Sequence, residues 1–242
     1  MTEIAIAYDV PTLDQALALD ERLGSGPEYA KVGLELFSAE GPVAVRALKE
    51  RGRRVFLDLK LHDIPNTVRG AARAAGRLGA DLLTVHATGG YAMVAAAVEG
   101  AREGGGGTKV IAVTILTSLS ASTMPPGFQI PFHTVLVAPK LLAMAESAGA
   151  YGIVCAAPDL FAIRAMHPQP FFAITPGIRP AGGAPHDQQR VTTVTEAVRM
   201  GSSMLVLGRA VTGAADPAAA LAAARAERDA AVEPATQGQP SA

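Results

Sequence analysis

Short apolar segments alternate with longer, amphipathic and alanine-rich segments along almost the whole chain. The short segments are continuously apolar rather than alternating, which is typical of parallel strands covered by helices. They predict strands at Ile4–Val10, Tyr29–Leu36, Arg54–Leu61, Leu82–Ala87, Val110–Leu116, Gly152–Ala156, Phe171–Thr175 and Met204–Leu207. The longer segments predict helices at Thr12–Leu23, Pro42–Arg51, Val68–Leu78, Tyr91–Arg102, Val135–Ser147, Leu160–Met166, Val194–Met200 and Pro217–Asp229. Eight strand–helix units in succession favour a closed (β/α)₈ TIM barrel over a doubly wound open sheet, which usually stops at five or six strands.

A chain of 242 residues could form two domains, but barrels of strands and helices routinely reach this length as one. Asp216 is placed to cap the last helix, with Pro217 at its first position. No apolar period follows Ala231. We therefore expect a barrel domain over residues 1–231 and a disordered tail over 232–242. The N-terminus lacks a basic segment followed by an apolar one, so we expect no secretory signal.

Composition narrows the class of protein. The formal net charge is −1, which argues against a nucleic-acid-binding face. No apolar run reaches the roughly 18 residues needed to span a bilayer, so we expect no membrane segment. The single cysteine, Cys155, lies in an apolar strand segment and is interpreted as a core residue. A chain with one cysteine forms no internal disulfide, which fits a reducing cytoplasm.

The stretch from Phe56 to Thr67 gathers charged residues where a strand gives way to a helix. Asp58 and Lys60 are two apart and therefore project to the same side of the strand, with Phe56 behind them. Ile64-Pro65 stops the strand, Asp63 lies in the turn, and Asn66 or Thr67 is expected to cap a helix starting at Val68. A buried ion pair needs only two partners, so the additional carboxylate indicates a functional site.

Polar residues recur at the carboxyl ends of the predicted strands, where the active sites of such barrels lie. They are Asp9, Lys31, Asp58, Lys60, Thr117, Ser118, the segment Pro176-Gly177-Ile178-Arg179, Gly208 and Arg209. The seventh and eighth loops commonly hold a phosphate, which glycines allow the backbone to approach and arginines grip. Gln188, after Gly182-Gly183, is placed to reach over a bound ligand. Position alone therefore predicts an anionic, phosphorylated substrate.

The run Phe-Leu-Asp-Leu-Lys-Leu-His-Asp-Ile-Pro-Asn-Thr-Val (56–68) resembles the signature of the orotidine 5′-phosphate decarboxylase family. The resemblance extends from about Ile4 to Gly213. Tyr8 departs from the leucine usual before the aspartate, and Ala210 from the common proline. The loop Ser118–Thr134 matches nothing in the family pattern, and both a lid and a surface insertion remain open for it. The further matching segments are Lys31-Val32-Gly33, Leu83-Thr84-Val85-His86, Leu116-Thr117-Ser118, Thr175–Arg179, Asp187–Arg190 and Val206–Arg209.

The resemblance implies a cofactor-free decarboxylation of orotidine 5′-phosphate to UMP and carbon dioxide. It also implies roles for the matching residues. Asp9 binds the ribose, Lys31 links the ribose to the acidic cluster, Asp58 faces the substrate carboxylate and Lys60 delivers the proton. Thr117 and Ser118 lie beside the pyrimidine with Pro176 nearby, and the phosphate is bound by Arg179, Gln188, Gly208 and Arg209. It also implies a homodimer in which Asp63 and Thr67 reach across the interface.

Two other functions remain to be weighed. A related magnesium-dependent phosphosugar decarboxylase or aldolase would carry an acidic metal ligand where this chain has Lys31. A non-catalytic nucleotide-binding module would not need Lys60 among aspartates. His62 and His86 are interpreted as packing or positioning residues, and no histidine pair has metal-ligand spacing, so we expect no metal site.

Overall fold

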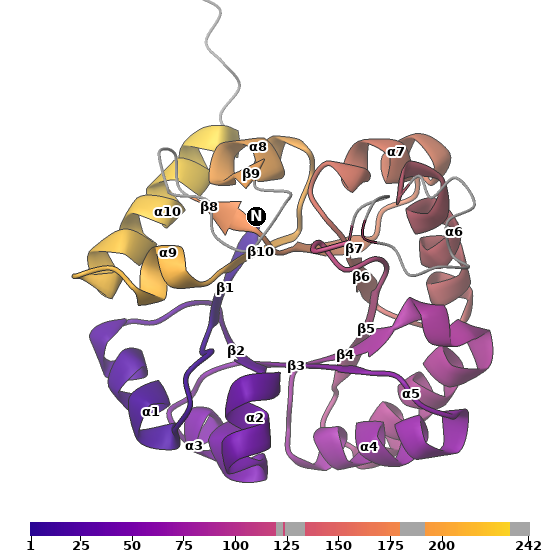
Figure 1. The fold of residues 1–242 in the computed structure, drawn as a ribbon, viewed down its shortest axis with the longest axis horizontal. Helices are drawn as coiled ribbons and strands as arrows, with labels where there is room; N and C mark the ends of the chain where they lie inside the picture. Colours follow the sequence, from indigo (N-terminus) through magenta and orange to yellow (C-terminus); the bar gives the residue numbers. More distant parts are fainter. Residues whose placement is uncertain (120–122, 124–133, 180–191, 233–242) are drawn as a thin grey trace, which may run out of the picture.

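The computed structural model describes residues 1–119, 123, 134–179 and 192–232. Eight parallel strands close into a barrel in the order β1-β10-β7-β6-β5-β4-β3-β2, with the helices around the outside (Figure 1). The strands are β1 (Glu3–Ala7), β2 (Tyr29–Gly33), β3 (Val55–Leu61), β4 (Leu82–His86), β5 (Lys109–Val113), β6 (Gly152–Val154), β7 (Phe172–Thr175) and β10 (Met204–Leu207). The predicted (β/α)₈ barrel is confirmed.

The helical layer follows the predicted order, with three additional short helices among the described residues, α2, α9 and the 3₁₀ helix η1. The helices are α1 (Leu13–Arg22), α2 (Leu34–Glu40), α3 (Pro42–Glu50), α4 (Pro65–Arg77), η1 (Ala87–Gly89), α5 (Gly90–Gly104), α6 (Thr134–Ser147), α7 (Asp159–Met166), α8 (Val194–Arg199), α9 (Arg209–Thr212) and α10 (Pro217–Val232). Strands β8 (Ile178–Arg179) and β9 (Thr192–Thr193) form a separate two-stranded parallel sheet that is not part of the barrel. None of the helices in the described part of the chain combines the length and hydropathy that crossing a bilayer requires.

Side-chain alternation along the strands produces two apolar layers. Ile4 and Ile6 of β1 belong to the large cluster packed against the helices. Ala5, Phe56 and Ile174 belong to a second cluster that fills the inside of the barrel. The interior is therefore a packed core, and only the ends of the strands are left to form a site.

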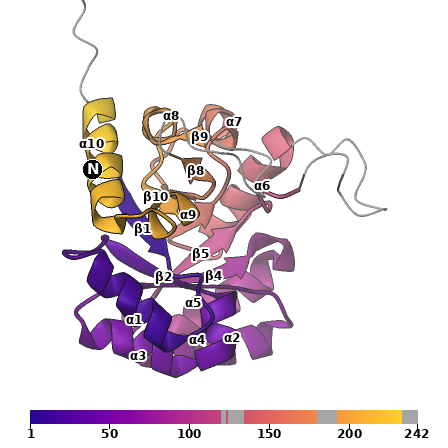
Figure 2. The ribbon, with the colours of Figure 1, turned by 60° about the vertical axis from the view of Figure 1, so that its left-hand side comes forward.

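Helices α4 and α5 are neighbours in the helical layer (Figure 2), and their backbones come into contact because glycines of α5 face α4. A Cβ at Gly100 would come within 2.2 Å of the Arg69 carbonyl oxygen, and one at Gly104 within 2.6 Å of the Arg73 carbonyl oxygen. This close packing fixes α4, which directly follows the charged stretch of β3.

The second strand was predicted three residues too long. It ends at Gly33, and Leu34–Glu40 forms α2 instead. Leu34 and Glu35 are exposed whereas Leu36 is fully buried, a pattern that places the apolar residues on one helical face. The first and fifth strands also end earlier than predicted, at Ala7 and Val113.

The predicted start of α4 is wrong, because the helix begins at Pro65 rather than Val68 and no side chain caps it. Proline suits the first helical position, since its missing N–H would have no partner there. Asp63 lies just before the helix and its Oδ1 accepts a hydrogen bond from the Ile64 backbone N–H at 2.6 Å. The cap predicted for α10 is confirmed, since Asp216 Oδ1 accepts from the Ala219 N–H at 3.0 Å. Helix α10 extends to Val232, and residues 233–242 of the predicted tail lie outside the described residues.

Candidate active site

A cavity of about 530 Å³ opens at the carboxyl ends of the barrel strands. This size suits a nucleotide-sized ligand, since small-molecule sites are typically about 300–1,000 Å³. Polar groups line it from Asp9, Lys31, Glu35, Asp58, Lys60, Thr117, Arg179 and Arg209. The other lining residues are Ala7, Phe56, Val113, Ile115, Leu116, Val154, Ile174, Pro176, Gly177, Val206 and Gly208. The cavity thus has a charged side and an apolar side.

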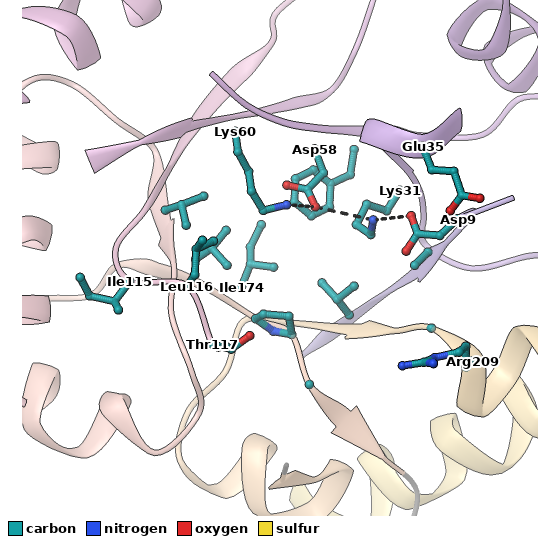
Figure 3. Close-up of a pocket in the computed structure, with 18 of the residues that line it drawn as sticks. Asp9, Lys31, Glu35, Asp58, Lys60, Ile115, Leu116, Thr117, Ile174 and Arg209 are labelled. Carbon is teal, nitrogen blue, oxygen red and sulfur yellow. Dashed lines mark hydrogen bonds and ion pairs between the residues drawn. The ribbon is translucent and has the colours of Figure 1, made fainter. Parts of the chain in front are cut away.

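Four charged side chains of alternating sign lie in a row along one wall (Figure 3). Lys60 Nζ lies 2.7 Å from Asp58 Oδ2, and Lys31 Nζ lies 3.6 Å from the same oxygen. Lys31 Nζ also donates to Asp9 Oδ1 at 3.0 Å. The Lys31 and Asp58 side chains are almost buried, whereas about half of the Asp9 side chain is exposed. The row therefore runs from solvent at Asp9 to a desolvated ion pair at its centre.

Asp58 is ionised despite its burial. Burial raises the pKa of its carboxyl, but attraction to Lys31 and Lys60 together with hydrogen bonds from Lys60 and Thr84 outweighs that effect. The net pKa lies below the ordinary value. A carboxylate therefore stands in the cavity at neutral pH, next to an ammonium group.

Lys60 adopts an unusual backbone conformation, with φ at +49°. The pairing of β3 with β4 shifts register between Leu57 and Leu61, so Lys60 lies in an irregular part of the strand. The sequence correctly predicted that Asp58 and Lys60 point to the same side. Simple strand alternation is an incomplete reason for it, because the strand is not regular at this point.

Two arginines and two glycines line the cavity just after the ends of β7 and β10, and we call this group the arginine end. Arg179 on β8 is buried, and its Nε has no hydrogen-bond partner among the described residues. Gly177 has φ of +79°, a conformation that favours glycine. Gly208 directly precedes α9, whose first residue is Arg209, and Figure 3 shows Arg209 away from the lysine pair. Guanidinium groups and the N–H groups of a first helical turn are suited to an anion.

Several predicted site residues do not reach the cavity. Asp63 and Thr67 are exposed and are not among the lining residues of this chain. Ser118 is also exposed and stands outside the lining, next to Thr117, which is part of it. Gln188 and most of the 118–134 loop lie outside the described residues.

Glu35 and the apolar wall also line the cavity, although nothing in the sequence pattern marked them as site residues. The predicted second strand includes Glu35, whereas β2 ends at Gly33, so Glu35 follows a strand end, as active-site residues of barrels do. The apolar residues carried no signal that separated them from the core.

The two histidines near the site lie side by side. The rings of His62 and His86 have centroids 5.4 Å apart. Burial, followed by the proximity of His62 and Lys60, lowers the pKa of His86. Within the described part of the chain, no group of three His, Cys, Asp or Glu side chains is arranged to hold a metal ion.

Residues 2–224 match the model of the family described as "Orotidine 5'-phosphate decarboxylase / HUMPS family". The chain belongs to this family. It is 52% identical over 219 residues to the orotidine 5′-phosphate decarboxylase of Anaeromyxobacter sp. (strain K), covering 90% of this chain and 94% of that protein. It is 46% identical over 225 residues to that of Cutibacterium acnes, covering 93% and 95%.

Solved structures agree with the sequence relatives. The crystal structure of orotidine 5′-phosphate decarboxylase from Lactobacillus acidophilus superimposes with a TM-score of 0.83 at 34% identity. The match covers 95% of this chain and all of that one. The family expected from the 56–68 signature is therefore confirmed.

Proposed function

We propose that this protein converts orotidine 5′-phosphate to UMP and carbon dioxide, the last step of de novo pyrimidine nucleotide synthesis. Eight relatives with this name are 44–52% identical to this chain over more than nine-tenths of their own length. The observation that carries the proposal is the ion pair of Lys60 with the buried Asp58 on the wall of the cavity.

In the proposed reaction, the bond between the pyrimidine ring and the carboxylate breaks, and its electron pair stays on the ring carbon. The Lys60 ammonium stabilises this negative charge and then donates a proton to the same carbon. Solvent returns a proton to Lys60. No electron-accepting cofactor takes part in this scheme, so the protein must stabilise the charge electrostatically.

Asp58 is suited to destabilise the bound carboxylate. Two unit negative charges 4 Å apart repel each other by about 4 kcal/mol at an effective dielectric constant near 20. This repulsion favours reaction only because it disappears when the carboxylate leaves as neutral carbon dioxide. The substrate must therefore be held in place by binding energy from elsewhere.

The arginine end of the cavity is the source we propose for this binding energy. Arg179 and Arg209, with the backbone at Gly177 and Gly208, bind the phosphate, and Gln188 is proposed to complete this site. The buried Nε of Arg179, which has no hydrogen-bond partner among the described residues, supports an anion there. The ribose then lies near Asp9 and Lys31, and the pyrimidine packs on the apolar wall near Thr117, Ser118 and Pro176.

We also propose that the enzyme is a homodimer in which Asp63 and Thr67 complete the partner's site. Within one chain these two residues are exposed and outside the cavity lining. Ile64, between them, is 66% exposed although it is a large apolar residue. A partner chain seated on this segment would cover the exposed Ile64 side chain together with Asp63 and Thr67.

The test is a spectrophotometric assay of purified protein with orotidine 5′-phosphate, with and without EDTA. We expect UMP and carbon dioxide in equal amounts and the same rate after EDTA treatment. Absence of turnover would refute the proposal. A rate abolished by EDTA and restored by magnesium would instead favour the metal-dependent phosphosugar chemistry weighed above.

A further inference from the structure

We infer that Thr84 is a positioning residue for the Asp58–Lys60 pair, an inference that rests on the proposed decarboxylase function. Its hydroxyl holds the backbone of Lys60 and the carboxylate of Asp58 at the same time. Thr84 lies in β4, next to β3 in the barrel (Figure 1), and is fully buried. It is absent from the cavity lining, so it acts through the pair and not on the ligand.

The Thr84 hydroxyl accepts one hydrogen bond and donates another. Oγ1 accepts from the Lys60 backbone N–H at 2.9 Å and donates to Asp58 Oδ1 at 2.9 Å. A hydroxyl carries a single proton. Because the Lys60 N–H already points at Oγ1, the hydroxyl proton is directed to the carboxylate, and the two bonds reinforce each other's geometry.

The irregular backbone of β3 explains why a side chain is needed at this position. The register shift between Leu57 and Leu61 interrupts the regular pairing of β3 with β4, and Lys60 has positive φ. A buried backbone N–H without a partner is costly, so such groups are almost always bonded. The hydroxyl of Thr84 supplies the acceptor and thereby stabilises the conformation that turns the Lys60 side chain toward Asp58.

Because Thr84 donates to one oxygen of the Asp58 carboxylate, the two oxygens have different partners. Oδ1 accepts from Thr84, which leaves Oδ2 for Lys60 Nζ at 2.7 Å and Lys31 Nζ at 3.6 Å. The orientation of the carboxylate plane is thus fixed by Thr84 on β4 at one oxygen and by Lys31 on β2 and Lys60 on β3 at the other. Loss of the hydroxyl would free the carboxylate to rotate and would leave the Lys60 N–H without its acceptor.

The inference is tested with Thr84→Val, which keeps the shape but removes the hydroxyl, and Thr84→Ser, which retains it. Thr108→Val is the matched control, because the buried Thr108 hydroxyl, just before the start of β5, donates its hydrogen bond to the Ala80 carbonyl oxygen and not to a cavity residue. If Thr84→Val does not fold, Thr84→Ala takes its place, since it introduces no larger group. Each variant is assayed for kcat, KM and the Kd of UMP.

We expect Thr84→Val to lower kcat by about 10- to 100-fold, as loss of a supporting hydrogen bond to a charged catalytic group does. KM and the UMP Kd should stay within about threefold, because the arginine end is untouched. Thr84→Ser should recover most of kcat, and Thr108→Val should retain it. A kcat of Thr84→Val within threefold of wild type, or a loss that Thr84→Ser does not recover, would overturn the inference.

A second readout does not depend on turnover. The pKa of the Asp58 carboxyl is measured by ¹³C NMR titration in wild type and in the Thr84 variants. The charged or titratable groups around this carboxyl are Lys31, Lys60 and the nearby His86. Removing a donor that stabilises the carboxylate should raise the pKa of Asp58 in Thr84→Val but not in Thr84→Ser. An unchanged pKa of Asp58 in Thr84→Val would overturn the positioning role, whether or not the wild-type protein is active. Absence of decarboxylase activity in wild type would refute the proposed function instead.

Discussion

Replacing Lys31 by methionine tests how much the protein depends on the cation at the centre of the charged row. Lys31 Nζ lies 3.0 Å from Asp9 and 3.6 Å from Asp58, and its side chain is 9% exposed. At 3.6 Å and an effective dielectric constant near 20, the attraction to Asp58 alone amounts to about 4–5 kcal/mol. Removing one partner of a buried pair typically costs about 3–5 kcal/mol. Lys60 still holds Asp58 in the variant, so we expect the free energy of unfolding at pH 7 to fall by about 3 kcal/mol.

The loss should depend on pH with a defined sign. The pKa of Asp58 is lowered in the folded protein, so its ionised form contributes stability above the unfolded-state pKa of about 3.9, and this contribution is lost as pH falls through the folded pKa. Without Lys31 the buried carboxylate is less stabilised and its pKa rises. Once Asp58 is protonated, Lys31 has no carboxylate to stabilise at this position, so its removal costs less. The difference between Lys31→Met and wild type should therefore be largest near neutral pH and shrink toward acid pH.

The measurement is urea unfolding followed by circular dichroism at several pH values. Lys49→Met is the matched control, because Lys49 pairs with Asp81 at 2.8 Å with both side chains about one-third exposed. Such a pair is worth about 0–1 kcal/mol. If Lys31→Met lost no more stability than Lys49→Met at pH 7, or lost more at acid than at neutral pH, the account of the charged row would be wrong.

Two further predictions concern the phosphate site and the dimer. Arg209→Ala should weaken UMP binding by about 10- to 100-fold in calorimetry but uridine binding by far less, because only UMP offers a phosphate; equal weakening would remove Arg209 from the phosphate site. Inactive Lys60→Ala and Asp63→Ala chains, mixed and allowed to exchange, should recover about a quarter of wild-type activity, because half the dimers are mixed and each of these contains one intact site. No recovery after exchange verified by mass spectrometry would place Asp63 in its own subunit's site.

The repeating pattern of strands and helices was enough to predict the barrel, because hydrophobic periodicity reports which faces are buried. It was not enough for the boundaries. The alternation of Leu34, Glu35 and Leu36 is what a half-buried strand would show, so the predicted strand extends to Leu36, whereas these residues begin α2. Only packing against the neighbouring helices distinguishes the two.

The charged wall of the site was predictable because strand ends converge at one face of a barrel. The role of Thr84 was not, since nothing in a sequence marks where a strand changes register. The positive φ of Lys60 and the resulting need for a side-chain acceptor are properties of the folded backbone. Asp63 and Thr67 are the opposite case: the family signature predicts them as site residues, but the fold of a single chain does not bring them to the cavity, because their predicted place depends on a second chain.

The most direct test of the central claim is the turnover of orotidine 5′-phosphate by Lys60→Ala. Lys109→Ala is the control, since Lys109 is an exposed lysine at the start of β5, over the Tyr151 ring. Both variants should fold, and both should bind UMP through the arginine end of the cavity. We expect Lys60→Ala to lose at least about 10³-fold in kcat, because both the proton donor and the charge that stabilises the carbanion are removed, while Lys109→Ala retains wild-type activity. A folded Lys60→Ala enzyme with kcat within tenfold of wild type would contradict the account.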